Sequence, residues 1–169
     1  EKVFAKTLKQ FMGQLSDSTS TVLWDSLMER IEEVPVPYQP TVIRGMGKLV
    51  GAEMSFDPMA APDYPLDSRL GERFRSDTFK DAFYEGVGAG FAETLIRFWR
   101  RLLLPEESKD HLYNRMLDME WERSQRLMGQ VFPLYSARIR RGFLQELQTR
   151  TIDGSIRSYL YGKGDVPDV

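Results

Sequence analysis

Three carboxylates interrupt glycine-rich, apolar stretches of this 169-residue chain, at Glu53, Glu85 and Glu93. If two of them met in a poorly solvated place, the pKa of one would rise, and that group could act as a general acid. The alternative is that they pair with an arginine such as Arg44 or Arg97, or face solvent. We therefore name them as candidate catalytic residues in a chain that we expect not to be an enzyme.

Other chemistries have little support in the composition. The chain has no cysteine, which excludes disulfides, thiolate nucleophiles and cysteine-based metal sites. Its single histidine, His111, cannot supply the two Glu-x-x-His motifs of a carboxylate-bridged di-iron site, and we expect it to be an exposed residue near a helix start. The sequence therefore predicts no metal site and no cofactor.

The segment 83-FYEGVGAGFAET-94 contains a Gly-x-Gly-x-Gly run of the kind found in phosphate-binding loops. Such a loop requires a buried strand before the glycines and a helix that begins at them. The preceding residues instead carry helix-start signals, with Ser76 as a potential N-cap and Asp77 next to it. The glycines are therefore predicted to lie inside a helix and not around a nucleotide.

Four glycines form two pairs with helical i,i+4 spacing: Gly47 with Gly51, and Gly86 with Gly90. Each pair places its members on one helix face, in predicted helices 41–55 and 77–104. Each helical glycine costs about 0.5–1 kcal/mol relative to alanine, so something must offset it. A close crossing of the two backbones would do so. The alternative is a groove, lined by these glycines, that holds an apolar small molecule.

The segment 95-LIRFWRRLLL-104 mixes large apolar residues with arginines. On a helix, Arg97, Arg100 and Arg101 project to one side, which fits a core helix with a basic outer face and also a helix on an anionic membrane surface. We take these arginines and Trp99 as the predicted partner surface. Arginines and tyrosines also recur towards the C-terminus, but a net charge of −2 does not favour nucleic-acid binding.

Periodic apolar residues and turn signals predict a series of helices. The expected ranges are 3–15, 21–34, 41–55, 66–75, 77–104 and about 106–149, the last of them broken near 129–133 by Pro133. Prolines 35, 37 and 40 predict an extended linker, and residues 57–65, which hold three prolines, predict a surface loop. The Asp153-Gly154 pair favours either a short hairpin or a break between two helices.

The expected fold is all-α, a compact bundle of about six helices with a glycine-mediated close crossing. Residues 1–161 are predicted to form one domain and residues 162–169 a flexible tail. No run of 18 uncharged apolar residues is present, so we expect a soluble chain without a transmembrane segment, and the compartment is not predicted.

The predicted function is a non-catalytic helical binding or assembly domain that holds a protein partner, or a second copy of itself. The alternative is a small-molecule module that binds an apolar ligand between helices 41–55 and 77–104, with carboxylate acid–base chemistry.

Overall fold

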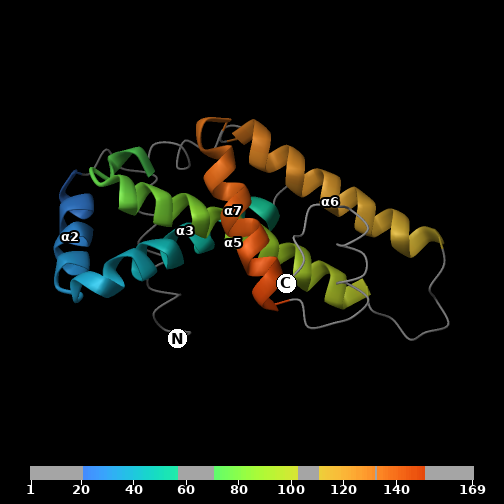
Figure 1. The fold of residues 1–169 in the computed structure, drawn as a ribbon, viewed down its shortest axis with the longest axis horizontal. Helices are drawn as coiled ribbons and strands as arrows, with labels where there is room; N and C mark the ends of the chain where they lie inside the picture. The colour runs from blue at the N-terminus through green and yellow to red at the C-terminus, as the bar shows by residue number, and fades with distance from the viewer. Residues whose placement is uncertain (1–20, 57–70, 103–110, 132, 151–169) are drawn as a thin grey trace.

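The computed structural model describes residues 21–56, 71–102, 111–131 and 133–150 (Figure 1). The α-helices in these ranges are α2 (Thr21–Glu32), α3 (Gln39–Phe56), α5 (Asp77–Leu102), α6 (His111–Val131) and α7 (Ser136–Arg150). Two short 3-10 helices, η1 (Val36–Tyr38) and η3 (Pro133–Tyr135), precede α3 and α7, and residues 71–73 are also helical. No strand occurs in these ranges, and the predicted all-α architecture is confirmed.

The predicted helices 21–34 and 41–55 correspond to α2 and α3, with ends that differ by at most two residues. The predicted helix 77–104 corresponds to α5, which begins at Asp77 as expected, and residues 103–104 lie outside the described part of the chain. Ser76 immediately precedes α5, and its carbonyl accepts the amide of Lys80 at 3.0 Å, as expected for a residue at the helix start. Several predictions fall outside the described residues: the helix at 3–15, the loop at 57–65, the hairpin at Asp153-Gly154 and the tail at 162–169.

The prolines between α2 and α3 form a tighter connection than the predicted extended linker. Pro35 is extended, with φ −51° and ψ 133°, but the chain then turns at once through η1, where the Tyr38 amide donates to the Pro35 carbonyl at 2.8 Å. Pro40 lies in the first turn of α3. The expectation of an extended linker is wrong beyond Pro35, because proline fits the first turn of a helix, where its missing N–H has no intrahelical partner.

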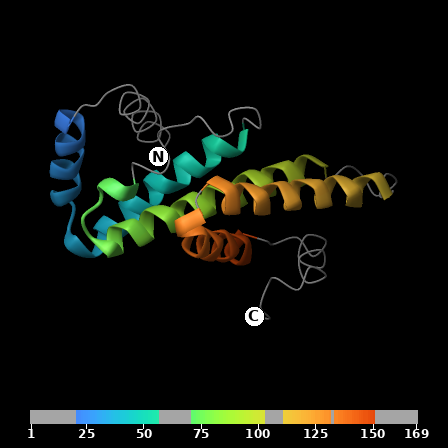
Figure 2. The ribbon, with the colours of Figure 1, turned by 90° about the horizontal axis from the view of Figure 1, so that it is seen from above.

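The predicted break near Pro133 separates two helices. Helix α6 ends at Val131, η3 carries Pro133, and α7 begins at Ser136, whose hydroxyl donates to the Pro133 carbonyl at 3.2 Å. Figure 1 shows that α7 then turns back and crosses α5, while Figure 2 shows α6 running alongside the second half of α5.

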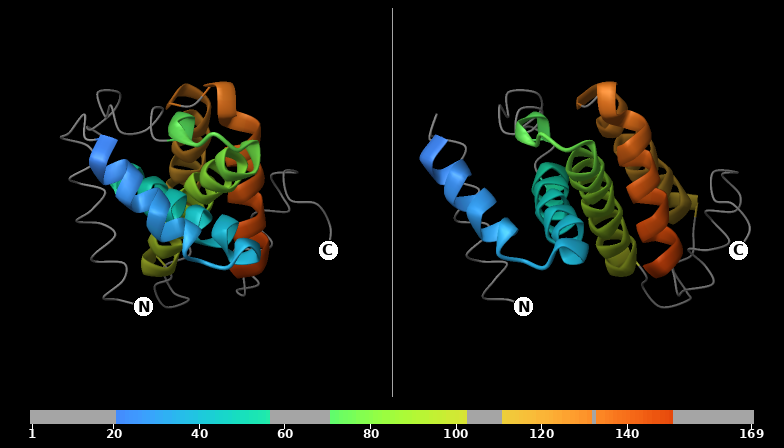
Figure 3. Two further views of the ribbon diagram at one scale, coloured as in Figure 1. Left: turned by 90° about the vertical axis from the view of Figure 1, so that its left-hand side faces the viewer. Right: turned by 60° about the vertical axis from the view of Figure 1, so that its left-hand side comes forward.

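Helix α5 is the centre of the arrangement. In the right-hand view of Figure 3, α2, α3, α5 and α7 follow one another as layers, with α5 between α3 and α7. Much of α5 is buried, including Phe83, Val87 and Phe91, each at most 1% exposed. Trp121 of α6 packs against Phe143 of α7, with ring centroids 5.7 Å apart. None of the described helices combines the length and apolar character needed to cross a bilayer.

Candidate functional site

The paired glycines lie where α3 and α5 touch. A Cβ atom added at Gly47 or Gly51 would come within 3.0 Å of the backbone of Phe83 or Val87 on α5. The relationship is reciprocal, because a Cβ added at Gly86 or at Gly90 would meet the backbone of α3 equally closely. The predicted close crossing of these helices is therefore confirmed, and it brings one backbone directly against the other.

The alternative hypothesis placed a groove for an apolar ligand at Gly47, Gly51, Gly86 and Gly90. Main-chain atoms of the opposite helix occupy the space beside each of these glycines. Van der Waals contact between two backbones leaves no room for an apolar ligand at these positions. The glycines act here as packing residues.

A second close crossing joins α5 to α7. A Cβ added at Gly88 would lie within 3.0 Å of the Ile139 carbonyl and the Phe143 amide, and one added at Gly142 would meet the backbone of Glu85. This crossing was not predicted from the sequence. The available signal was Gly142 itself, an interior helical glycine between the periodic apolar positions Ile139 and Phe143.

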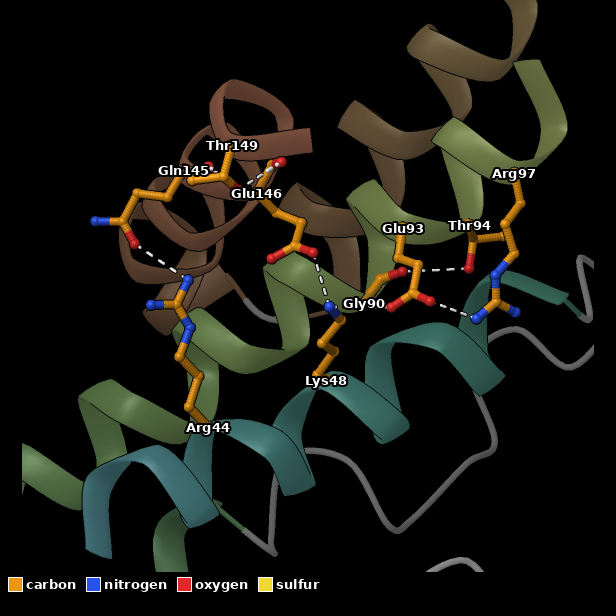
Figure 4. Close-up of polar contacts among 9 residues, drawn as sticks. All are labelled: Arg44, Lys48, Gly90, Glu93, Thr94, Arg97, Gln145, Glu146 and Thr149. Carbon is orange, nitrogen blue, oxygen red and sulfur yellow. Dashed lines mark hydrogen bonds and ion pairs between the residues drawn. The ribbon is translucent and has the colours of Figure 1, made fainter. Parts of the chain in front are cut away.

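Lys48 links three helices at the edge of these crossings (Figure 4). Its Nζ lies 3.0 Å from Glu93 Oε2 on α5 and 2.7 Å from Glu146 Oε1 on α7. Arg97 also pairs with Glu93. The two glutamate side chains are only 19% and 12% exposed, so water screens these ion pairs less than it would on an open surface.

The other candidate carboxylates have separate positions. Glu85 pairs with Arg141 of α7, so it does not meet Glu93 in a shared site. Arg44 donates to Gln145 Oε1 at 3.2 Å, again between α3 and α7 (Figure 4). Glu53 belongs to α3, but its side chain is outside the part of the structure that is described. The two candidate carboxylates whose side chains are described, Glu85 and Glu93, are thus engaged in ion pairs between helices.

The electrostatics of Glu93 do not suit a general acid. Burial raises its pKa, but the hydrogen bonds and charges of Arg97 and Lys48 outweigh burial, and the net pKa is lowered from the ordinary value of 4.5. A general acid at neutral pH needs the opposite shift. Glu93 is therefore an anion at neutral pH, and its chemistry here is to join α5 to α3.

Replacing Lys48 by methionine should destabilise the protein by about 2 kcal/mol, because two partly buried carboxylates lose a charged partner. The substitution should also make the free energy of unfolding less dependent on pH in the acidic range. Since the pKa of Glu93 is lower in the folded state than in the unfolded chain, stability falls as the pH drops below about 5 through the folded-state value. Urea unfolding between pH 3 and pH 7 measures both effects.

Lys80→Met is the matched control, because Lys80 lies 3.9 Å from Asp77, whose side chain is 90% exposed. It should leave the acid dependence unchanged. Equal acid dependence in the wild-type protein and Lys48→Met would contradict the role assigned to Lys48.

The predicted partner surface is described only in part. Arg97 is exposed and is held by Glu93, its neighbour one turn earlier on α5. Trp99, Arg100 and Arg101 belong to the last turns of α5, and their side chains lie outside the described set. His111 is the first residue of α6, with its side chain likewise outside that set. Among the described residues, no three potential ligands cluster to hold a metal ion.

A groove of about 680 Å³ lies between α2 and the chain that leads into α5. Its walls carry opposite charges. The lining residues are Asp25, Met28, Glu29 and Glu32 from α2 and Arg73, Arg75, Ser76 and Phe79 from the other side. This groove was not predicted from the sequence, because it is formed by two segments about 45 residues apart whose contact no local pattern indicates.

No protein-family model, curated protein or solved structure matches this chain. Geometry and charge are therefore the grounds for a functional proposal.

Proposed function

We propose that this chain is a helical binding domain that holds a protein partner, and that the partner docks in the groove between α2 and the start of α5. The supporting observation is the groove itself. Its charged residues, such as Glu29 and Arg75, are exposed, while its two apolar side chains, Met28 and Phe79, are half-buried. An apolar centre with a polar rim is the usual composition of a protein–protein interface.

The rest of the structure supports a binding role over catalysis. Glu85 and Glu93 are occupied by ion pairs between helices, and the pKa of Glu93 is lowered, not raised. The groove also suits an apolar small molecule poorly. Pockets for such ligands are lined predominantly by apolar side chains, whereas six of the eight residues that line this groove are polar or charged.

The platform around the groove is suited to holding a partner in a fixed orientation. Phe79 lies on the first turn of α5, and its ring makes an edge contact with the buried Phe74, with centroids 6.3 Å apart. Helix α5 is in turn packed between α3 and α7 by backbone contact. One wall of the groove is thus tied directly to the core, so a docked partner would lose little affinity to rearrangement of that wall.

Site-specific photocrosslinking in cells that make the protein natively tests this proposal. With benzoylphenylalanine in place of Glu32, at the groove, a discrete adduct with another polypeptide is expected on irradiation. With the same group in place of Leu134, which is 81% exposed on η3, that adduct should be absent. An empty lane at position 32, or the same adducts at both positions, would contradict docking in the groove.

A further inference from the structure

The walls of the groove carry opposite charges that do not neutralise one another. On α2, Asp25, Glu29 and Glu32 are four and three residues apart, so they share one helix face. Along the axis they are spaced by about 6 Å and about 4.5 Å. None of the three forms an ion pair within the described residues. Glu33, the residue that follows α2 and lies outside the groove, is paired with Arg30 at 3.0 Å.

The facing wall is basic. Arg73 and Arg75 come from the segment just before α5, and both are exposed. Arg75 forms no ion pair with any residue that the structure describes. Between the walls, Met28 and Phe79 present the apolar surface of the groove. Methionine adapts its shape to different apolar partners, which suits a surface that receives a side chain from another molecule.

Elsewhere in the bundle, opposite charges on facing helices are joined. Lys48 reaches Glu93 at 3.0 Å, and Arg138 pairs with Asp81 across α5 and α7. Across the groove, by contrast, the acidic face of α2 and Arg75 stay apart, with a volume of about 680 Å³ between them. The groove thus presents a row of carboxylates on α2 and the cation of Arg75 opposite it, and an occupant of complementary charge could pair with both.

We infer that the groove takes a basic segment of a protein partner. This inference rests on the proposed function and specifies the chemistry of the partner. The segment carries at least two lysines or arginines towards the acidic face of α2 and an apolar side chain that packs between Met28 and Phe79. An acidic group on its other side faces Arg75. Because the lining has three carboxylates against two guanidinium groups, the segment has a net positive charge.

Charge selects this occupant over other macromolecules. Phosphates of a nucleic acid or an anionic membrane would be repelled by the three carboxylates of α2 that line one side of the groove together with Met28. The basic residues of such a segment are attracted to the carboxylates of α2, and its acidic group is attracted to Arg75 on the other side. Exposed ion pairs each contribute little, about 0.2–1 kcal/mol, so such an interaction gains its specificity from the pattern of charges.

Selection from a phage-displayed library of random 12-residue peptides tests the inference. Enriched peptides are expected to contain two or more basic residues near an aliphatic or aromatic residue. Fluorescence anisotropy with the best peptide should show at least about tenfold weaker binding to Glu29→Lys/Glu32→Lys, since two attractions become repulsions. Binding to Glu33→Lys, which reverses the charge of one carboxylate outside the groove, should change less than about twofold.

A charge-reversed peptide separates recognition from misfolding. With its basic residues changed to glutamate, the peptide should bind Glu29→Lys/Glu32→Lys more tightly than it binds the wild-type chain. Arg75→Glu should weaken the original peptide about threefold, and Arg126→Glu, on the exposed face of α6, should not.

The remaining outcomes distinguish this inference from the proposed function. Enriched peptides without basic residues, or peptides indifferent to Glu29→Lys/Glu32→Lys, would overturn the assigned chemistry. If the adduct at position 32 is still found in that case, the binding function stands and only the partner class is wrong. If the adduct is also absent, both fail. An adduct with a second copy of this chain would overturn the assignment to another protein.

Discussion

Gly47→Ala is expected to lower the free energy of unfolding by at least about 3 kcal/mol, through the addition of a single methyl group. The added Cβ would be forced against the Phe83 carbonyl of α5, and neither backbone can move aside without separating the helices. Overpacking against side chains typically costs about 1–3 kcal/mol, and main-chain atoms relax less easily than side chains. Since domains have only about 5–15 kcal/mol of net stability, the larger Gly90→Leu should not fold.

Gly45→Ala supplies the control two residues earlier on α3. Gly45 is exposed, and a Cβ there would meet nothing within 4 Å. The substitution should therefore raise stability by about 0.5–1 kcal/mol, the usual gain when alanine replaces a helical glycine. Urea unfolding followed by circular dichroism gives both values. If Gly47→Ala were as stable as Gly45→Ala, the two backbones could not be in contact.

Gly142→Ala is expected to have the second-largest effect, with a loss of about 2–3 kcal/mol. Its new methyl group would meet the Glu85 backbone, and α7 would have to shift away from α5. That shift would also disturb Phe143, which is fully buried next to Gly142 and packs on Trp121 of α6. We therefore expect the near-ultraviolet circular dichroism of the tryptophans to change along with the unfolding midpoint.

Gly129→Ala is the corresponding control for the second crossing. Gly129 lies on α6, is exposed and has nothing within 4 Å of its Cβ position. It should be neutral or stabilising by up to about 1 kcal/mol and leave the near-ultraviolet spectrum unchanged. Similar stability for Gly142→Ala and Gly129→Ala would show that α7 does not approach α5 through Gly142.

Much of the helical architecture could be predicted from local sequence. Periodic apolar residues, the Ser76 helix start and the Pro133 break indicate elements close to those observed, because these signals act within one or two turns. The i,i+4 glycines also indicated a close crossing, since two glycines on each of two helices match one another. The prolines at 37 and 40 were misjudged, because proline disrupts the interior of a helix but is tolerated in its first turn.

The candidate site depends on which helices meet, and local patterns do not contain that information. Lys48 and Glu146 are 98 residues apart, and nothing around either residue indicates the other. The groove is similar, since Glu29 and Arg75 become opposite walls only after α2 and α5 take their places. The carboxylates were notable in the sequence because they stand among glycines. The same proximity to the crossings brings cations from neighbouring helices to Glu85 and Glu93.

The three glycines of α5 have a consequence for how the chain folds. Together they weaken the intrinsic preference of that segment for a helix by about 2–3 kcal/mol relative to alanine, a penalty comparable with the small helical stability of an isolated peptide. Helix α5 is therefore expected to be unstable on its own until α3 and α7 pack against it. Those two helices in turn pack directly against the α5 backbone at its glycines. Their formation is mutually conditional, so this part of the molecule is expected to gain and lose its structure in a single concerted transition.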